Sequence, residues 1–197
     1  MELDIGSILN SITETNLPDP CMWQYYRYLA RNVIIINQEI GDEILETAIL
    51  PYMDMMKNPN VDEIEIILST VGGGIYDGFN LVDILDKTTK KTTIHIMSMA
   101  ASMGTYIAMA GHNNPLVKTV CHPFSVGLLH AGSASYSGSM TQIRDGIDFN
   151  KKYEDRVKEY VLTHSDITPE FYEKIERQEY WMDSEEMLRL GIVDEII

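Results

Sequence analysis

The chain has 197 residues, of which 45% are apolar, so one core could bury about two-thirds of the unfolded surface and we expect a single domain over residues 21–197. The formal net charge is −15 and there are only 15 Lys and Arg residues, which excludes the usual means of holding a nucleic acid or an anionic membrane. No apolar run approaches the ~18 residues of a membrane span, and the start "MELDIGSILN" lacks the basic flank and apolar stretch of a signal peptide, so we expect a cytoplasmic protein.

The N-terminal part contains two different segments. Residues 1–20, "MELDIGSILNSITETNLPDP", are polar and end in Pro-Asp-Pro, which predicts an arm that is mobile or contacts another subunit. The aromatic-rich "CMWQYYRYLARN" that follows predicts a packed helix. The two cysteines, Cys21 and Cys121, have no CxxC spacing, and we interpret both as buried thiols.

Strand-like and helix-like segments then alternate. The patterns predict strands in "VIIIN", "EIEIILST" and "TTIHIMS", and helices in "IGDEILETAILPYMDMMKN", where Pro51 would make a kink, and in "YDGFNLVDILDK". In the first of these helices the apolar positions at approximate helical spacing are Ile40, Ile44, Ile49, Tyr52, Met53 and Met56. This alternation predicts an α/β fold with a mostly parallel sheet and covering helices.

The second half begins with a further helix in "MAASMGTYIAMAG" and a buried strand in "SVGLLH". "SMTQ" at Ser139 fits a capping box, and it opens an apolar stripe of about twenty residues that predicts one long helix. The stripe consists of Ile143, Ile147, Tyr153, Val157, Tyr160 and Val161. A helix of about 30 Å is as long as a small domain is wide, so this stripe would pack on the core or on another subunit. Near the C-terminus Asp183 or Ser184 can cap a short helix that ends at Gly191, before the strand "IVDEI".

Two glycine-bearing turns carry candidate chemistry. Ser102 falls at the first turn of a helix, where the unpaired amide of Met103 would stabilise negative charge on a nearby oxygen. The triplet "GGG" at residues 72–74 follows a strand and would present further N–H groups to a substrate backbone. These turns also fit a purely structural role, as a close-packed turn and a flexible loop. No Lys-Ser or Lys-Thr follows the glycines, so they do not form a phosphate loop.

A nucleophilic serine needs a base, and His130 is the preferred candidate among five histidines. His130 ends the apolar run "SVGLLH", so a buried strand would carry its imidazole to the same sheet edge as Ser102. His122 in "VCHPF" is the second choice. The remaining histidines, His95, His112 and His164, are interpreted as structural.

These elements together resemble a known family. "MAASMGTYIAMAG", the preceding "STVGGGIYDG", the strand-end His130 and the terminal "MDSEEMLRLGIVDEI" are similar, in the same order, to the proteolytic subunit of the Clp protease, ClpP, or to a ClpP-like peptidase such as those in phage-derived genomes. The similarity covers about residues 30–197. It implies the fold of the ClpP and crotonase group, a spiral of ββα units with a protruding handle helix, and the activity of a serine endopeptidase that works through an acyl-enzyme.

The resemblance also implies roles for particular residues. Ser102 matches the nucleophile and His130 the base, while the amides of Gly73 and Met103 match the oxyanion donors. An extended peptide would bind by strand addition along the cleft. The residues implied in substrate binding are Gly72, Gly74, Ile75 and Ser133. No metal or other cofactor is implied.

The chain departs from the family pattern at three places. The family commonly has Ser-Pro-Gly-Gly at the first turn, where this chain has "STVGG", and Gln-Pro after the base, where this chain has "AG". Alignment on "GIVDEI" puts Glu179 opposite the family's catalytic aspartate, with Glu176 and Asp183 as alternatives. A glutamate can also hold the imidazole tautomer.

The resemblance implies a homo-oligomer as well. The helix after Ser139 would be the handle that joins two heptameric rings into a chamber for peptide or unfolded protein, and an ATP-dependent unfoldase would be a partner. The family's Asp-Arg pairing is missing around Arg177 and Gln178, and the N-terminal arm does not match the axial-pore segment, so ring stacking and docking stay open. Two alternatives also remain: a crotonase-type acyl-CoA enzyme and a non-catalytic ring subunit.

Overall fold

The computed structural model describes residues 20–197 of the chain. The predicted arm, apart from its last residue, and the side chain of Cys21 lie outside this description. In chain order the elements are α2 (Pro20–Leu29), β1 (Val33–Ile36), the π-helix η2 (Leu45–Ile49), α3 (Leu50–Lys57), β2 (Glu63–Thr70), α4 (Ile75–Leu85), β3 (Lys91–Ala101), α5 (Met103–Met109), β4 (Val117–Cys121), β5 (Val126–Leu129), α6 (Met140–Thr163), α7 (Pro169–Ile175), β6 (Tyr180–Met182), α8 (Ser184–Arg189) and β7 (Glu195–Ile196).

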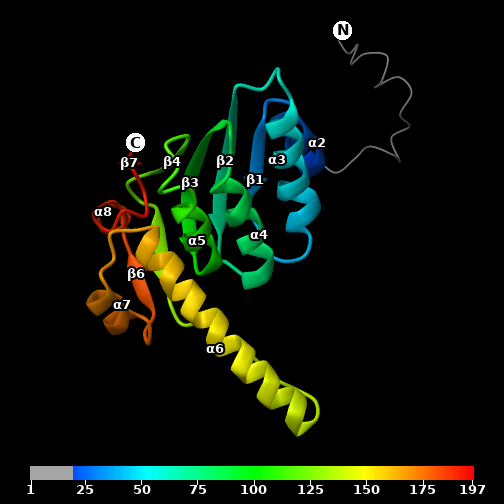
Figure 1. Cartoon of the computed structure of the whole chain (residues 1–197). Helices are drawn as coiled ribbons and strands as arrows, with labels where there is room; N and C mark the ends of the chain where they lie inside the picture. Colours follow the sequence, from blue (N-terminus) through cyan, green and yellow to red (C-terminus); the bar gives the residue numbers. More distant parts are fainter. Residues whose placement is uncertain (1–19) are drawn as a thin grey trace.

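The strands of the described chain form one mixed sheet. β1, β2, β3, β4 and β7 pair in that order and in parallel, which confirms the predicted α/β class. Helices α3, α4 and α5 lie along one face of this sheet, and α2 lies beside β1 (Figure 1). Alternation in β2 explains the packing, because Ile64, Ile66 and Leu68 are fully buried between exposed or half-buried neighbours.

Strand β3 changes its neighbour along its length, and this positions the candidate site. Its first half pairs with β4, from Thr92 opposite Val117 to Ile96 opposite Cys121. Its last residues pair instead with β5, and Ala101 lies opposite Leu128. The end of β5 is thereby placed directly beside the end of β3. β6 then adds to β5 in antiparallel orientation.

The first long helix differs from its prediction. Ile40 lies outside the helix and pairs as an isolated bridge with Gly73, and it is buried. The helical segment begins as a π-helix and becomes α-helical at Leu50, just before Pro51. Pro51 has no N–H to donate to the preceding turn. The sequence predicts a kink at this residue, and the structure has a change of helix type there.

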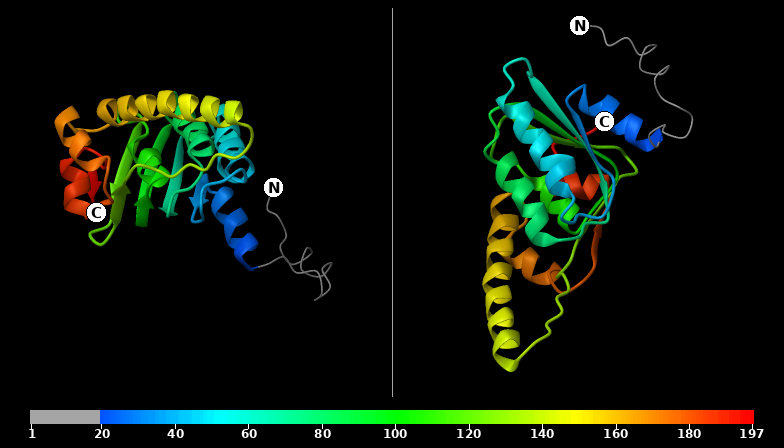
Figure 2. Two further views of the ribbon diagram at one scale, coloured as in Figure 1. Left: turned by 90° about the horizontal axis from the view of Figure 1, so that it is seen from below. Right: turned by 90° about the vertical axis from the view of Figure 1, so that its right-hand side faces the viewer.

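Helix α6 starts far from the sheet and reaches it only near its C-terminal end (Figure 1). The view from below and the view from the right-hand side show the same long helix lying beside the body of the molecule (Figure 2). Its N-terminus has the predicted capping box, in which Ser139 and Gln142 exchange side-chain to backbone hydrogen bonds. Within the predicted apolar stripe only Val157 and Val161 are buried. The stripe contacts the core from the middle of the helix onward, because the half-buried Tyr153 also packs edge-on against Tyr76 and Phe79.

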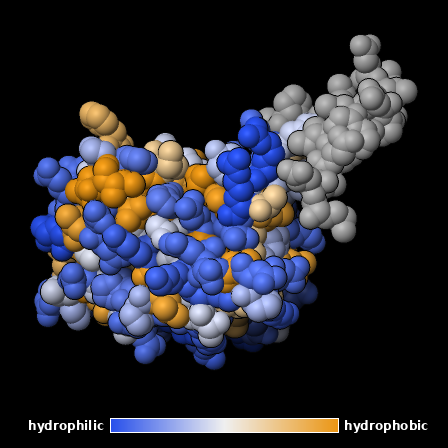
Figure 3. Space-filling view, turned by 90° about the horizontal axis from the view of Figure 1, so that it is seen from above, coloured by the Kyte–Doolittle hydropathy of each residue, from blue (hydrophilic) through white to orange (hydrophobic). Residues whose placement is uncertain are grey.

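The surface seen from above mixes hydrophobic and hydrophilic residues (Figure 3). Such mixing is usual for a folded protein surface. Among residues 20–197 no helix combines the length and the apolar character that crossing a bilayer requires.

Candidate active site

Ser102 occupies a sharp turn between β3 and α5. It is the N-cap of α5 with φ 54° and ψ −118°, so it precedes the helix rather than lying in its first turn as predicted. In residues 20–197 only one other non-glycine residue, Asn32, has positive φ. Such a conformation costs about 1–3 kcal/mol and occurs often at functional sites, where it exposes a side chain that a regular strand or helix would hide.

Because residue 72 is a glycine, the turn at residues 72–74 can lie close to Ser102. A Cβ on Gly72 would lie 2.5 Å from the carbonyl oxygen of Ala101 and 2.7 Å from Cβ of Ser102. Both contacts are too short for any side chain, and φ of Gly72 is 97°. The two glycine-bearing turns that the sequence singles out therefore touch at the serine.

His130 directly follows β5 and points at the serine. Its Nε2 lies 2.9 Å from Oγ of Ser102, within hydrogen-bond distance. Ser102 is also tied to the same strand through its backbone, because its N–H donates to the carbonyl of Leu128 at 2.9 Å. His122, the second-choice histidine, follows β4 instead.

Glu179 lies in the turn before β6, opposite the other nitrogen of the same imidazole. Its Oε1 is 3.0 Å from Nδ1 of His130. The pairing of Leu129 with Tyr180 in the β5–β6 ladder explains this approach, because the histidine and the glutamate each lie one residue beyond a paired position. The side chain of His130 is 25% exposed and that of Glu179 is 62% exposed.

The two alternative carboxylates have other contacts. Glu176 caps the end of α7, its carboxylate lies 3.6 Å from Nε of Arg177, and its backbone carbonyl accepts from Ala131 N–H. Asp183 caps α8 by accepting from the N–H of Glu186. Of the three acidic residues considered from the sequence, only Glu179 contacts the imidazole.

Two backbone amides near the serine are free of partners in the described chain. Ile40 donates to the carbonyl of Gly72 and accepts from the N–H of Gly74, which leaves the N–H of Gly73 between them without an acceptor. The amide of Met103 opens α5, where no preceding turn accepts from it. These are the two donors that the sequence analysis assigned to an oxyanion.

The remaining residues predicted to bind substrate differ in their backbone pairing. Gly72 donates to Oγ1 of Thr70 and Gly74 donates to Ile40, so the amides of both are already used inside the protein. Ile75 begins α4 and is half-buried, while Ser133 is exposed in the irregular stretch after His130. Of the glycine triplet, therefore, only Gly73 has an amide to offer a ligand.

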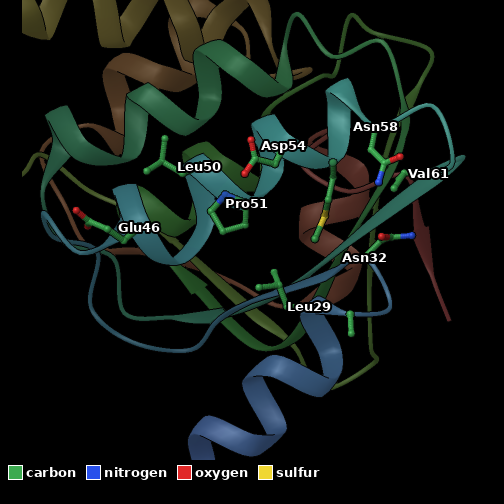
Figure 4. A pocket seen from close by; sticks show the side chains of 10 residues that line it. Leu29, Asn32, Glu46, Leu50, Pro51, Asp54, Asn58 and Val61 are labelled. Carbon is green, nitrogen blue, oxygen red and sulfur yellow. The ribbon is translucent and has the colours of Figure 1, made fainter. Parts of the chain in front are cut away.

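One hollow of the described chain lies away from these three side chains. It has a volume of about 450 Å³ and opens between the end of α2 and the η2–α3 helix, with Leu29, Asn32 and Asp54 on its walls (Figure 4). A second, polar hollow of about 510 Å³ is lined by residues of β6 and α8. Ser102, His130 and Glu179 line neither of them.

No three His, Cys, Asp or Glu side chains between residues 20 and 197 gather as ligands for a metal ion. Cys121 is a buried free thiol, as predicted, and burial raises its pKa above the usual value.

Comparison with known proteins shows the family of the chain. The family described as Clp protease matches residues 20–197. The chain belongs to the Clp protease family. Among its relatives is the ATP-dependent Clp protease proteolytic subunit of Lactococcus lactis subsp. cremoris, which is 26% identical over 175 residues, or 88% of this chain and 86% of the relative.

Two further relatives carry the same description. The Streptococcus uberis protein is 26% identical over 178 residues, covering 88% of each chain, and the Deinococcus radiodurans protein is 23% identical over 173 residues, covering 88% of this chain and 83% of the relative. Membership of the Clp protease family makes this chain a serine-type peptidase and confirms the resemblance that the sequence motifs indicated.

Sequence reasoning missed several residues that shape the site. Ile40 was expected inside a helix, but it holds the Gly72–Gly74 turn through two backbone hydrogen bonds. Thr70 and Thr105, both buried, place their hydroxyls against the backbone of the two turns. Nothing in the local sequence distinguishes these threonines from ordinary core residues, because their partners are up to 32 residues away along the chain.

Proposed function

We propose that this chain is an endopeptidase in which Ser102 is the nucleophile, His130 the general base and Glu179 the residue that orients the base. The observation that carries the proposal is the continuous hydrogen-bonded path from Ser102 Oγ to His130 Nε2, at 2.9 Å, and from His130 Nδ1 to Glu179 Oε1, at 3.0 Å. This is the arrangement by which a weakly nucleophilic hydroxyl is activated in acyl transfer.

The reaction would proceed in two halves. Ser102 Oγ attacks the peptide carbonyl while Nε2 of His130 takes its proton, and His130 then gives that proton to the leaving amine as the C–N bond breaks. Water next attacks the acyl-enzyme, with His130 again accepting a proton and returning it to Ser102 Oγ. Glu179 accepts the Nδ1–H hydrogen bond and stabilises the imidazolium that forms.

The amides of Gly73 and Met103 would hold the developing oxyanion. Both are free of internal acceptors among the described residues, and one belongs to each of the two turns that touch at Ser102. Loss of one such donor typically costs about 3 kcal/mol of transition-state stabilisation. An extended peptide would lie as an added strand beside Gly72, Gly74, Ile75 and Ser133.

The site would act inside a homo-oligomer. The N-terminal part of α6 carries apolar side chains that residues 20–197 leave exposed, among them Met140 at 81% and Phe149 at 56% exposure. We propose that a second copy of the chain covers this part of α6, and that heptameric rings joined by these handles enclose the site in the cytoplasm. The relatives are described as ATP-dependent proteolytic subunits, so an ATP-driven unfoldase is the partner that would deliver unfolded protein.

Labelling with a fluorophosphonate probe and mapping of the adduct by mass spectrometry tests the proposal. We expect one adduct, on Ser102, that disappears in Ser102→Ala and in His130→Ala. Ser98→Ala is the matched control, because Ser98 is an exposed serine on the same strand and its loss should leave labelling unchanged. We also expect peptide cleavage by Ser102→Ala to fall below about a thousandth of the wild-type rate, as for other triad nucleophiles.

Other results would support different functions. Absence of an adduct on a folded chain would favour a non-catalytic ring subunit, and thioester turnover would favour a crotonase-type acyl-CoA enzyme. An adduct on a different serine, or cleavage by Ser102→Ala above a thousandth of the wild-type rate, would remove Ser102 from the role of nucleophile.

A further inference from the structure

The contact between the ends of β3 and β5 decides how far Ser102 lies from His130. The two strands make their last paired position at Ala101 and Leu128. Beyond it, the N–H of Ser102 donates to the carbonyl of Leu128, two residues before His130. A small shift between the strands at this position would move the serine hydroxyl relative to the imidazole.

The hydroxyl of one threonine lies between the ends of β3 and β5. Thr105, in the first turn of α5, is fully buried, and its Oγ1 lies 2.6 Å from the carbonyl oxygen of Ala100 on β3 and 2.7 Å from that of Leu128 on β5. The N–H of Leu128 also approaches the same Oγ1, at 3.4 Å. One hydroxyl thus contacts both strands at their last paired position.

We propose that Thr105 is a positioning residue for the reaction: its hydroxyl holds the end of β3 that carries Ser102 against the end of β5 that carries His130. This inference rests on the proposed function. The hydroxyl has one proton, so it donates to one carbonyl at a time and accepts from the N–H of Leu128. In a buried site such a bond is little weakened by water.

The short distances explain why the hydroxyl, rather than the bulk of the side chain, matters here. A carbon atom approaches a carbonyl oxygen no closer than about 3.3 Å, so a methyl group in the place of Oγ1 would force the two strand ends apart. Valine has the same shape as threonine, so in Thr105→Val a methyl group would push the two strand ends apart. Thr105→Ala removes the hydrogen bonds of the hydroxyl without a steric clash. In Thr105→Ala, where nothing pushes the strand ends apart, the carbonyl of Leu128 keeps its bond from Ser102 N–H, so this buried acceptor is not left unpaired.

Steady-state kinetics and fluorophosphonate labelling of the full-length oligomer test the inference. A displacement on the order of 1 Å at a reacting group can cost about a hundredfold in rate. In Thr105→Val we expect the rate constant for labelling Ser102, and kcat for a peptide, to fall by about tenfold to a hundredfold with KM nearly unchanged. Thr105→Ser should recover most of the rate, because it retains the hydroxyl.

Thr119→Val is the matched control. Thr119 is another buried threonine, and its Oγ1 donates to the carbonyl of Ala108 at 2.8 Å, away from the junction of β3 and β5. We expect a comparable change in thermal stability but a labelling rate close to wild type. If Thr105→Val does not fold, Thr105→Ala takes its place, since it introduces no steric clash.

The outcomes separate this inference from the proposed function. If wild type reacts at Ser102 and the Thr105 variants react at the same rate, the positioning role is wrong while the peptidase proposal stands. If Thr119→Val loses as much rate as Thr105→Val, the effect is general to the core and the inference is again overturned. If wild type itself forms no adduct at Ser102, the proposed function fails first.

Discussion

Glu179, which we propose as the residue that orients the base, is largely exposed to water. Its side chain is 62% exposed, although it lies 3.0 Å from the imidazole of His130. Solvent screens an exposed carboxylate, so its electrostatic support for a forming imidazolium is weaker than that of a buried one. In the proposed mechanism the hydrogen bond still favours the tautomer with its proton on Nδ1, which leaves Nε2 unprotonated to accept from the serine.

We expect Glu179→Gln to lower kcat for peptide cleavage by about tenfold to a thousandfold, less than the roughly 10⁴-fold effect of the same change at a buried acid. KM should change little, because Glu179 would not touch substrate. Glu176→Gln is the control, since that carboxylate does not contact His130, and it should retain wild-type turnover. Equal activity of Glu179→Gln and wild type would show that this carboxylate does not orient the base.

Among the elements, helix α6 is joined to the body of the molecule by a histidine at its C-terminal end. His164 caps α6, its Nε2 lies 3.2 Å from Oδ2 of Asp86 at the end of α4, and its ring stacks on that of Tyr160 at 4.1 Å between centroids. Asp86 also accepts from the N–H of Gly111 after α5. This cluster therefore connects α4, α5 and α6.

The charge of His164 contributes to this junction in a pH-dependent manner. Burial lowers the pKa of His164, but the hydrogen bond and charge of Asp86 and the bond to the carbonyl of Tyr160 outweigh it, so the pKa lies above the ordinary 6.5. A raised pKa in the folded state means that the protonated form stabilises the fold. That contribution is complete below pH 6.5 and is lost as the pH rises through the raised value.

We expect the melting temperature of wild type to fall by about 2 °C more than that of His164→Gln between pH 6 and pH 8.5, as measured by calorimetry. His112→Gln is the control, because His112 is exposed in the loop after α5, and it should follow wild type. A pH dependence of His164→Gln identical to that of wild type would contradict the role of this ion pair.

At the scale of the whole molecule, residues 20–197 leave the N-terminal part of α6 largely exposed. α6 has 24 residues, and its buried residues, Val157 and Val161, both lie in its last third. Met140 and Ile147, seven residues apart, lie on one face of the exposed part. Apolar side chains at this spacing are expected to pack against another helix.

We expect the double variant Met140→Glu with Ile147→Glu to form smaller particles than wild type in sedimentation experiments. Its secondary structure should be retained, because both side chains are exposed and neither belongs to the buried core. Thr141→Glu with Lys151→Gln, which changes the net charge equally on polar exposed positions, is the control and should keep the wild-type size. The assembly proposal fails if wild type sediments as a single subunit or if the double variant keeps its size.

The amino-acid sequence by itself determined the local conformation and the choice of chemistry. Apolar periodicity predicts most of the strands and helices, and the capping residues at Ser139 and Asp183 lie where the structure has them, because these signals depend on neighbours within a few residues. The small-residue turn and the strand end also single out Ser102 and His130. Helix α7 and strand β6 were not predicted, since both are short and their apolar pattern is weak.

Only the tertiary structure decided how distant segments meet. The exchange of neighbours along β3 brings His130 to Ser102. The β5–β6 ladder places Glu179, rather than Glu176 or Asp183, in contact with the imidazole. The bridge between Ile40 and Gly73 leaves the amide of Gly73 without an acceptor in the described chain. These contacts join residues far apart along the chain, and their distances depend on how sheet and helices pack together. Local sequence sets which groups are present, whereas packing sets the separation of a few ångströms on which their chemistry depends.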